Sequence, residues 1–347
     1  MDNLKVIKRT GEVVEFDIDR IKNAIHKAVK ATDTELPHEV FDELATNIVS
    51  EIEERFVDFH PNVENVQDIV EKHIVKKGLY EIAKEYILYR AKRQKEREEE
   101  RKLTLEKARL GKLTVKKRDG RTVLFDLNKI KNNIVRISKA YEKDVRIELI
   151  TKELVKNIYD GISTEEIEKA LVLSAVSFIE RDSAYSYIAS RLFLQKLYKE
   201  VIQRSITTRT IDGSYKDSFI GGIKRGVENN LIDERLLDFD LKRLSNGLIL
   251  ERDNLFQYIG IQTLYERYFT KIEDRRIELP QSFWMRIAMG LAINEKDKNN
   301  KALEFYEIMS TLRYVPSTPT LFHSGSTHPQ LSSCYLTTIS DDLSHIF

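Results

Sequence analysis

The sequence predicts a protein of the α+β class that is predominantly helical. Residues 4–17 and 113–126 are similar to each other, and each reads as two short strands around a turn that contains glycine. Apolar residues at helical spacing follow both segments, and the stretch between the two copies is rich in Glu, Lys and Arg. A chain of 347 residues is long enough for two or three domains, each with its own hydrophobic core.

Each copy begins with a predicted β-hairpin that leads into a helix. Residues 4–17 read LKVIKRTGEVVEFD and residues 113–126 read LTVKKRDGRTVLFD, so a Lys-Arg pair and a Phe-Asp pair recur at an offset of 109. A helical pattern starts directly after each hairpin. Asp19 and Asn128 stand at these starts, and we predict that their side chains cap the two helices.

The second halves of the copies are predicted to be helical. Residues 64–90 align with residues 165–191 at an offset of 101, which pairs Arg90 with Arg191. Apolar residues recur at helical spacing in both segments. Because solenoid repeats are only about 20–50 residues long, this longer repeat indicates a duplicated domain, each copy a hairpin packed on a small helical bundle.

Two stretches connect the predicted domains. Residues 91–112 are nearly all charged and predict a solvated helical extension that spaces the two copies. Residues 204–216 are rich in Thr, Ser, Arg and Gly without periodicity, and we predict an irregular linker there. Pro280 is placed to begin a helix, because proline is favoured in the first turn. Helical patterns follow the linker near residues 217–232, 234–245, 253–269, 280–294 and 298–313.

Residues 314–334, YVPSTPTLFHSGSTHPQLSSC, differ in composition from the rest of the chain. The prolines at 316 and 319 lead us to predict that residues 315–320 are not helical. Hydroxyl side chains crowd this loop, which suits hydrogen bonding to a small polar ligand, and the single cysteine, Cys334, stands at its end. From composition alone, the favoured interpretation is a polar loop followed by a buried strand at residues 334–339.

Charged residues make up 33% of the chain, but they nearly cancel to a net charge of +1. This balance argues against nucleic acid and anionic membranes as partners. One cysteine excludes a disulfide framework and a multi-cysteine zinc site, and it fits a reducing compartment. The N-terminus has no apolar signal region and no run of about 18 apolar residues occurs, so we expect a cytoplasmic protein without a membrane span.

Three histidines near the cysteine raise the question of a metal site. His323, His328 and His345 fit no zinc-binding spacing, and one cysteine with scattered histidines is weak evidence for a metal or for a Cys-His nucleophile. We therefore predict no metal site.

The loop of residues 316–334 closely resembles the loop and first barrel strand of the large subunit of class I and class II ribonucleotide reductases. Residues 254–268 also resemble the helical domain that precedes the barrel in that family. The resemblance implies a ten-stranded α/β barrel, of which this chain holds only the entry strand. It also implies roles for individual residues.

By this resemblance, Cys334 is catalytic and belongs to the redox pair of thiols that reduces the ribose 2′ position. Thr318 and Ser333 match positions that contact the substrate, and Asp341 and Asp342 match the start of the allosteric specificity site. The partner thiol and the radical cysteine come from later barrel strands in the family.

The duplicated segments resemble the ATP-cone, the nucleotide-binding regulatory domain of the same family. The pattern V-x-K-R-x-G, then F-D-x-x-R/K-I, and later VQDIVE and AKEYILYR carries this resemblance. In each copy, three cations converge on one edge and are suited to a polyphosphate, because arginine supplies planar forked donors. An aspartate is placed to accept from the base or ribose. The expected nucleotide-binding residues are Lys8, Arg9, Asp17, Arg20, Lys117, Arg118, Asp126, Lys129 and Thr164.

The two copies are not equivalent. The family has a hydroxyl residue just before the third helix, which Thr164 supplies in the second copy, whereas the first copy has Val63. The first copy nevertheless keeps the family pattern of the later helices better. We therefore expect the first copy to be the competent nucleotide binder.

The resemblance divides the chain into five parts. They are a first ATP-cone at residues 1–93, a charged helical linker at 94–112, a second ATP-cone-like domain at 113–203, a helical domain at 204–313 and the start of the catalytic barrel at 314–347.

The function implied is radical-based reduction of ribonucleoside diphosphates to deoxyribonucleotides for DNA replication, regulated allosterically by ATP and dATP bound with Mg. The radical source would be a small subunit in class I or cobalamin in class II. A thioredoxin- or glutaredoxin-type protein would be the reductant, and a homo-oligomer is expected. With one cysteine, the chain should be inactive alone, so we expect a second polypeptide to complete the barrel, as after a split gene, an intein or a truncation.

A regulatory module that senses ATP and dATP through its cones without catalysis is the alternative function. Repressors that carry a cone also carry a zinc ribbon, and this chain lacks the CxxC pairs that would build one. The loop before Cys334 also has no purpose in that interpretation.

Overall fold

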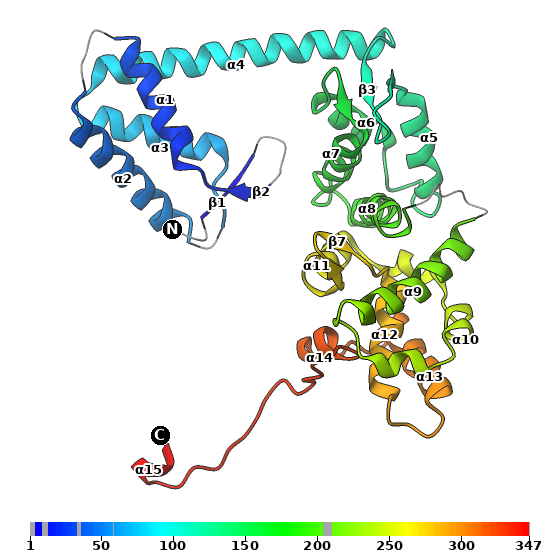
Figure 1. Ribbon diagram of the computed structural model, residues 1–347. Coiled ribbons are helices and arrows are strands. Elements are labelled where there is room, and N and C mark those ends of the chain that lie inside the picture. The colour runs from blue at the N-terminus through cyan, green and yellow to red at the C-terminus, as the bar shows by residue number, and fades with distance from the viewer. Residues whose placement is uncertain (1–3, 9–12, 33–35, 58, 204–209, 347) are drawn as a thin grey trace. The chain divides into compact units, whose positions relative to one another are not determined.

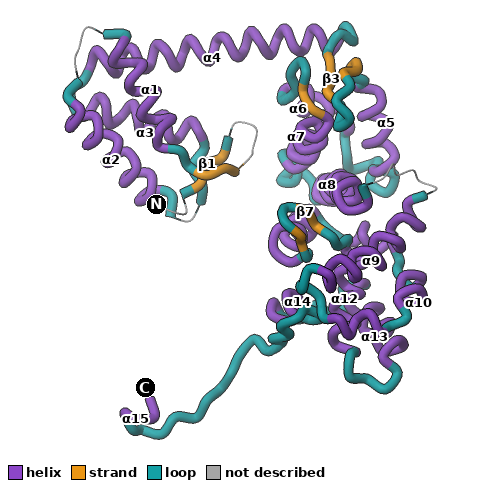
Figure 2. The backbone as a smooth tube through the Cα atoms, in the orientation of Figure 1, coloured by secondary structure: helices purple, strands orange, loops and turns teal. Residues whose placement is uncertain are grey.

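The computed structural model describes residues 4–8, 13–32, 36–57, 59–203 and 210–346, and within them it is mostly helical with three small sheets (Figures 1 and 2). The predicted class is thereby confirmed. Two compact units are formed, one by the residues up to Leu127 with Lys152–Ala170, and one by Asn128–Thr151 with the residues from Leu171 onward. Within the described ranges, no helix combines the length and apolar character that crossing a membrane requires.

The first hairpin and the helices after it enclose one hydrophobic core. The elements are β1 (Lys5–Ile7), β2 (Val13–Glu15), α1 (Ile18–Lys30), α2 (His38–Arg55), α3 (Val63–Lys76) and α4 (Tyr80–Arg109). The two strands pair antiparallel with Val6 opposite Val14. Ile25, Ile48 and Ile74, one from each of the first three helices, have no exposed surface. The predicted hairpin and helical bundle are confirmed for this copy.

The prediction that Asp19 caps the first helix was wrong by two residues, because α1 begins at Ile18. Asp17 is the capping residue, and its carboxylate accepts a hydrogen bond of 3.0 Å from the backbone nitrogen of Asp19. The same carboxylate lies 3.2 Å from Nε of Arg20. The prediction was wrong because an acceptor satisfies the free backbone donors of the first turn only from the position before that turn.

Helix α4 runs unbroken from the first bundle through the charged stretch between the copies. Its 30 residues end at Arg109, which corresponds to about 45 Å of helix at 1.5 Å per residue. Arg93 and Glu96 form an ion pair of 2.7 Å on its surface. The predicted solvated helical extension is confirmed.

The second hairpin carries a third strand that the sequence analysis did not predict. The strands are β3 (Thr114–Lys116), β4 (Thr122–Leu124) and β5 (Ile162–Ser163), with β3 antiparallel to β4 and parallel to β5. Asp160 fixes the approach of β5, because it accepts from the backbone nitrogen and hydroxyl of Thr114 at 2.8 and 2.7 Å. Its hydrogen bond from Lys107, at 2.8 Å, is the main cause that lowers the pKa of Asp160.

The remaining elements are mostly short helices. They are α5 (Leu127–Ile137), α6 (Ile147–Lys156), α7 (Thr164–Val176), α8 (Ala184–Ile202), α9 (Ile211–Glu228), η1 (Glu234–Asp238), α10 (Leu241–Asn246), η2 (Leu250–Leu255), α11 (Tyr258–Thr263), η3 (Leu264–Tyr268), β6 (Lys271–Ile272), β7 (Arg275–Arg276), α12 (Pro280–Ala292), α13 (Lys298–Ser310), α14 (Thr318–His323) and α15 (Leu343–Ile346). Pro280 is the first residue of α12, as predicted.

Two predictions about irregular backbone were wrong. Helix α9 begins at Ile211, so residues 211–216 of the predicted linker are helical. Helix α14 begins at Thr318, inside the stretch from which the prolines were expected to exclude helix. Pro319 lies in the first turn of α14, where a backbone nitrogen has no helical acceptor and proline is tolerated.

The predicted strand at residues 334–339 is not present. These residues have no regular secondary structure and all are exposed. A strand needs a neighbour that satisfies its backbone groups, and none of the described segments pairs with this one.

A buried carboxylate joins four helical elements in the second unit. Asp253, 1% exposed, accepts hydrogen bonds from the hydroxyl of Tyr198 at 2.6 Å, the hydroxyl of Tyr215 at 3.0 Å and Nε2 of Gln281 at 2.6 Å. Tyr306 donates to Oε1 of Gln281 at 2.8 Å. Because these side chains come from α8, α9, α12 and α13 around η2, the cluster fixes these elements together.

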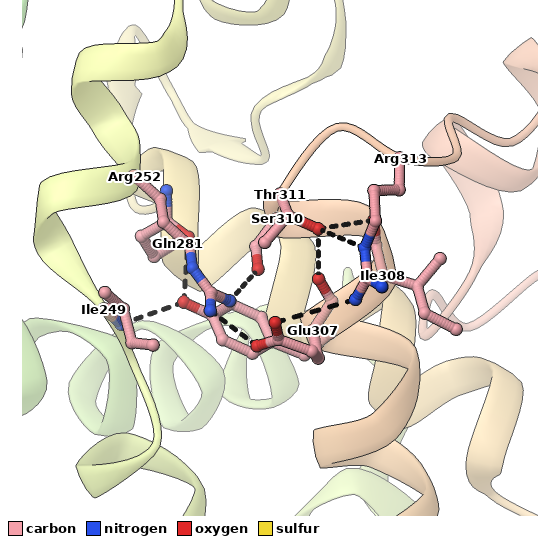
Figure 3. A network of polar contacts seen from close by, with 9 residues as sticks. Ile249, Arg252, Gln281, Glu307, Ile308, Ser310, Thr311 and Arg313 are labelled. Atoms are coloured by element: carbon pink, nitrogen blue, oxygen red, sulfur yellow. Dashed lines mark hydrogen bonds and ion pairs between the residues drawn. The ribbon is translucent and has the colours of Figure 1, made fainter.

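Polar contacts continue from this cluster to the surface, as Figure 3 shows. The backbone nitrogen of Ile249 donates to Tyr306, and Arg252 donates to Oγ of Ser310 at 2.6 Å and to Glu307 at 2.5 Å. Helix α13 is therefore held to the segment before α11 by charged and neutral hydrogen bonds together.

Asp253 makes the stability of this unit depend on pH. Burial raises its pKa to about 6, although its three donors act in the opposite direction. The folded state therefore binds this proton more tightly than the unfolded chain, in which the pKa is about 3.9. Its contribution to stability is complete below pH ~4 and is lost as pH rises through ~6.

We expect the Asp253→Asn variant to lose this pH dependence, because an amide does not ionise. Relative to the variant, the wild type should lose about 2–3 kcal/mol of unfolding free energy between pH 4 and pH 7. Urea unfolding measures this free energy when it is followed by the fluorescence of Trp284, the single tryptophan, which lies in the same compact unit as Asp253. Parallel pH profiles for the two proteins would contradict the assignment.

Candidate functional site

The predicted nucleotide-binding residues of the first copy lie at the end of its hairpin and the start of α1. Lys8 follows β1, whereas Arg9 lies outside the described residues. Arg20 is in the first turn of α1, with 76% of its side chain exposed, and it forms an ion pair with Asp17. Asp17 is thus committed to the helix cap and to Arg20 in this structure.

A pocket of about 170 Å³ lies in the same bundle and was missed by the sequence analysis. Its walls come from α1, α3 and α4, and they are Ala24, Gln67, Tyr86, Tyr89, Arg90, Arg93 and Arg97. Three arginines at positions 90, 93 and 97 share one face of α4, and this helical spacing was the signal that could have found them. Complete ligands usually occupy about 300–1,000 Å³, so this volume suits a part of a nucleotide such as its phosphates.

Carboxylates hold two of these guanidinium groups in place. Arg90 lies 2.7 Å from Asp68 and 3.2 Å from Glu71, both on α3. Arg93 pairs with Glu96 at 2.7 Å. Each guanidinium group has five N–H donors, so a carboxylate partner leaves donors for a phosphate. Burial raises the pKa of Tyr86 to about 12, which keeps this pocket residue neutral.

A wider cleft of about 730 Å³ lies between α2 and α3 of the same bundle. None of the predicted site residues lines it, and its walls carry charges of both signs. Glu51 accepts from Lys72 at 2.7 Å and lies 2.8 Å from Nε2 of His73, and the bond from Lys72 is the main cause that lowers the pKa of Glu51. These ion pairs within the cleft give no reason to assign a ligand to it.

In the second copy, the predicted phosphate-binding arginine is already neutralised. Arg118 lies 3.0 Å from Glu165 and 3.2 Å from Glu168, both on α7. The repeat alignment places Gln67 of the first copy at the position of Glu168. Arg118 is therefore paired with two carboxylates, as Arg90 is in the first copy.

The other predicted residues of the second copy are spread over the hairpin and two helices. Lys117 follows β3, and Thr164 is the first residue of α7. Asp126 directly precedes α5, and Lys129 lies in its first turn. The prediction that Asn128 caps this helix was wrong, because Asn128 lies inside α5.

The wall of three arginines is absent from the second copy. At the positions that correspond to Arg93 and Arg97, α8 carries Leu194 and Tyr198. Leu194 is 2% exposed, and Tyr198 donates to Asp253 in the core described above. This face of α8 therefore packs inside the second unit at these two positions, and Arg191, at the position of Arg90, donates to the backbone oxygen of Ile137.

The predicted catalytic segment is held at one end and exposed at the other. The hydroxyl of Thr318 lies 3.3 Å from the hydroxyl of Tyr268, and Thr320 donates to the backbone oxygen of Leu331 at 3.1 Å. Ser333 and Cys334 are exposed, and the thiol of Cys334 is free. The structure therefore places Thr318 on the helical domain but does not bring it together with Cys334.

The two predicted specificity-site aspartates lie close to the end of the described chain. Asp342 accepts from the backbone nitrogen and the hydroxyl of Ser344 at 2.8 and 2.7 Å, and these bonds lower the pKa of Asp342. Asp341 is exposed. Among the residues that the structure describes, no three His, Cys, Asp or Glu side chains are grouped so that they could hold a metal ion.

Comparison with known families matches three segments of the chain. The model of the ATP cone domain matches residues 4–95 and 113–200, which is more than half of the chain. The model of the ribonucleotide reductase all-alpha domain matches residues 254–329, which include helices α11, α12, α13 and α14.

Curated proteins also match the chain. The ribonucleoside-diphosphate reductase subunit alpha of Chlamydia muridarum is 39% identical over 355 residues, covering 99% of this chain and 34% of that protein. The corresponding subunit of Helicobacter pylori is 38% identical over 68% of this chain and 29% of that protein. The large subunit of Arabidopsis thaliana is 28% identical over 66% of this chain. The chain spans about a third of the length of the first of these relatives.

The family models agree with the duplicated hairpin bundles and the helical domain seen in the structure. This chain belongs to the ribonucleotide reductase family, with two ATP cone domains ahead of the family's all-alpha domain.

Proposed function

We propose that this chain acts as the N-terminal part of the large subunit of a ribonucleoside-diphosphate reductase. The observation that carries the proposal is the match of 99% of the chain to the alpha subunit of Chlamydia muridarum at 39% identity. The exposed thiol of Cys334, directly after a loop anchored to the all-alpha domain, agrees with it. We propose the domain borders given in the sequence analysis.

Cys334 would be one of the two thiols that reduce the substrate. The ribose 2′ hydroxyl leaves as water, the 2′ carbon gains a hydrogen, and the two thiols are oxidised to one disulfide. Because the chain has a single cysteine, the second thiol comes from residues outside this sequence. In that assembly Thr318 and Ser333 would contact the substrate, and Asp341 and Asp342 would begin the specificity site.

The exposed segment after Cys334 would become the first strand of the catalytic barrel. Tyr335 and Leu336 are 67% and 102% exposed, and the backbone around them is extended and unpaired by the described segments. Strands supplied by residues outside this sequence would satisfy that backbone and cover these side chains. A radical source (a small subunit or cobalamin), a thioredoxin- or glutaredoxin-type reductant and a further copy of the assembly are the partners that this proposal includes.

The first ATP cone domain would bind the regulatory nucleotide, ATP or dATP with Mg. Three arginines line its pocket, Lys8 follows β1 and Arg20 lies in the first turn of α1. The second domain would not bind it, because Leu194 and Tyr198 stand at the positions of Arg93 and Arg97 and pack inside the second unit. A nucleotide sensor without catalysis is less well supported, since it leaves the all-alpha domain and Cys334 without a role.

We expect Cys334→Ser to abolish reduction in the assembled reductase, because serine cannot supply the electrons of a thiolate pair. Activity should fall by at least about 10³-fold while the unfolding transition stays unchanged, since the residue is exposed. Thr337→Ser, a change of one methyl group in the same exposed segment, is the matched control. Full activity of the serine variant would exclude this residue from the redox pair.

We expect Arg97→Gln to weaken dATP binding about tenfold or more, because a charged hydrogen bond contributes about 1.5–3 kcal/mol. Arg118→Gln should leave the affinity unchanged, which makes it the matched control in the second domain. Isothermal titration of dATP into each purified chain measures both values. The opposite result, loss of binding only on substitution of Arg118, would assign the site to the second domain.

A further inference from the structure

A pair of opposite charges lies in the interior of the all-alpha domain. Arg286 on α12 is 1% exposed and Glu278, just before that helix, is 3% exposed. Nε of Arg286 donates to Oε1 of Glu278 at 2.5 Å, and the other oxygen of Glu278 accepts from the backbone nitrogen of Thr270 at 2.8 Å. Removing two charges from water costs several kcal/mol per ion, so such a pair is seldom a net source of stability. Its retention in the core calls for another explanation.

The arginine also holds the loop that leads to Cys334. Its Nη1 donates to the backbone oxygen of Ser324 at 2.5 Å, directly after α14. The hydroxyl of Ser324, itself fully buried, donates to the backbone oxygen of Ile287 at 2.8 Å. One turn of the loop is therefore bound to α12 by a charged and a neutral hydrogen bond.

Two glycines allow the loop to approach the helix this closely. A Cβ atom on Gly290 would lie 2.2 Å from the backbone nitrogen of Gly325. Gly325 has φ of +76°, which side-chain-bearing residues rarely adopt. On its other side, the backbone oxygen of Gly325 accepts from the nitrogen of Asp233 at 3.1 Å, and Thr327 donates to the oxygen of Asn230 at 3.1 Å. The loop is thus hydrogen bonded to α12 on one side and to the segment before η1 on the other.

The contacts of Ser324 and Gly325 with α12 lie, along the chain, between the residues proposed to act on substrate. Thr318 is at the start of α14, six residues before Ser324, and Leu331 accepts a hydrogen bond from Thr320 three residues before Cys334. Any displacement of Ser324 would move both ends of the loop. A shift of about 1 Å in a reacting group can cost about 100-fold in rate.

We propose that Glu278 and Arg286 are positioning residues for the reductase reaction. The pair fixes the loop of residues 317–331 on the all-alpha domain and thereby sets where Thr318 and the approach to Cys334 lie. The role of this pair in catalysis rests on the function proposed above, whereas its role in holding the loop on α12 is independent of that function.

The first test uses hydrogen exchange on the 347-residue chain with the double variant Glu278→Gln/Arg286→Met. Removing both charges avoids the unpaired buried carboxylate that Arg286→Met alone would leave. The amides of Leu321, Ser324 and Ser326, which are hydrogen bonded within the loop, should exchange about tenfold or more faster. Amides of α13 and the thermal midpoint should change little. Unchanged loop exchange, or an equal increase throughout the unit, would overturn the proposal.

The second test moves the loop without changing a charge. Gly290→Ala places its Cβ against Gly325 and should also speed exchange of the loop amides, whereas Gly221→Ala, a helical glycine with open space around it, should not. Equal loop exchange in both alanine variants would contradict the claim that the close approach of Gly290 and Gly325 helps to hold the loop on α12.

The third test measures catalysis in the assembled reductase. The double variant should lower kcat/KM about 100-fold and leave the affinity for dATP unchanged, and Arg286→Lys, which keeps one donor, should recover part of the loss. Normal kinetics despite faster loop exchange would refute the positioning role. An assembly that is inactive even with the wild-type chain would instead refute the proposed function, and the exchange results would still decide the role of the pair.

Discussion

Helix α12 has no solvent-facing side, and the second unit is organised by this constraint. Every residue from Pro280 to Met289 is buried, including two with strongly polar side chains. Buried polar groups must find partners inside the protein, because each unsatisfied one costs free energy. Gln281 finds them in Asp253 and Tyr306, and Arg286 finds them in Glu278 and the Ser324 carbonyl. Gln281 thus connects α12 to the neighbouring helices, and Arg286 holds the loop that precedes Cys334.

The sequence predicted the features that depend on local pattern. Repeated hairpins and helical periodicity predicted the two bundles, and Pro280 marked the start of α12, because these signals act within a few residues. The predictions that failed concern the ends of helices, where the outcome depends on the position of the first turn. Asp17 and Asp19 both have a capping side chain, and only the position of the first turn decides between them. The exclusion of helix by Pro319 ignored that the first turn tolerates proline.

The candidate site was predicted less completely, because its parts meet only in three dimensions. The hairpin cations were visible as a Lys-Arg motif, but the arginines of α4 lay in a run of charges that reads equally well as a solvated face. The pocket formed with α1 and α3 separates Arg93 and Arg97 from the other charged residues of that run. Likewise, nothing in the sequence pairs Arg286 with Ser324, which lies 38 residues away.

The two ATP cone domains end in equivalent helices that serve different purposes. After Arg90 the first helix continues with lysines and arginines, whereas after Arg191 the second continues with Leu192, Leu194 and Leu197, all nearly fully buried. Farther along α8, Glu200 accepts from Tyr265 at 2.9 Å and so joins the all-alpha domain.

A helix face cannot both present cations to a polyphosphate and pack in an apolar core, since buried guanidinium groups would need carboxylate partners at every position. The duplication resolves this conflict by dividing the two tasks. The first copy keeps a charged helix face beside its pocket, and in the second copy the corresponding face of α8 packs against the elements that follow it in the same unit. In the function proposed above, the second copy would not bind nucleotide, because Leu194 and Tyr198 fill the core at the positions where the first copy carries Arg93 and Arg97.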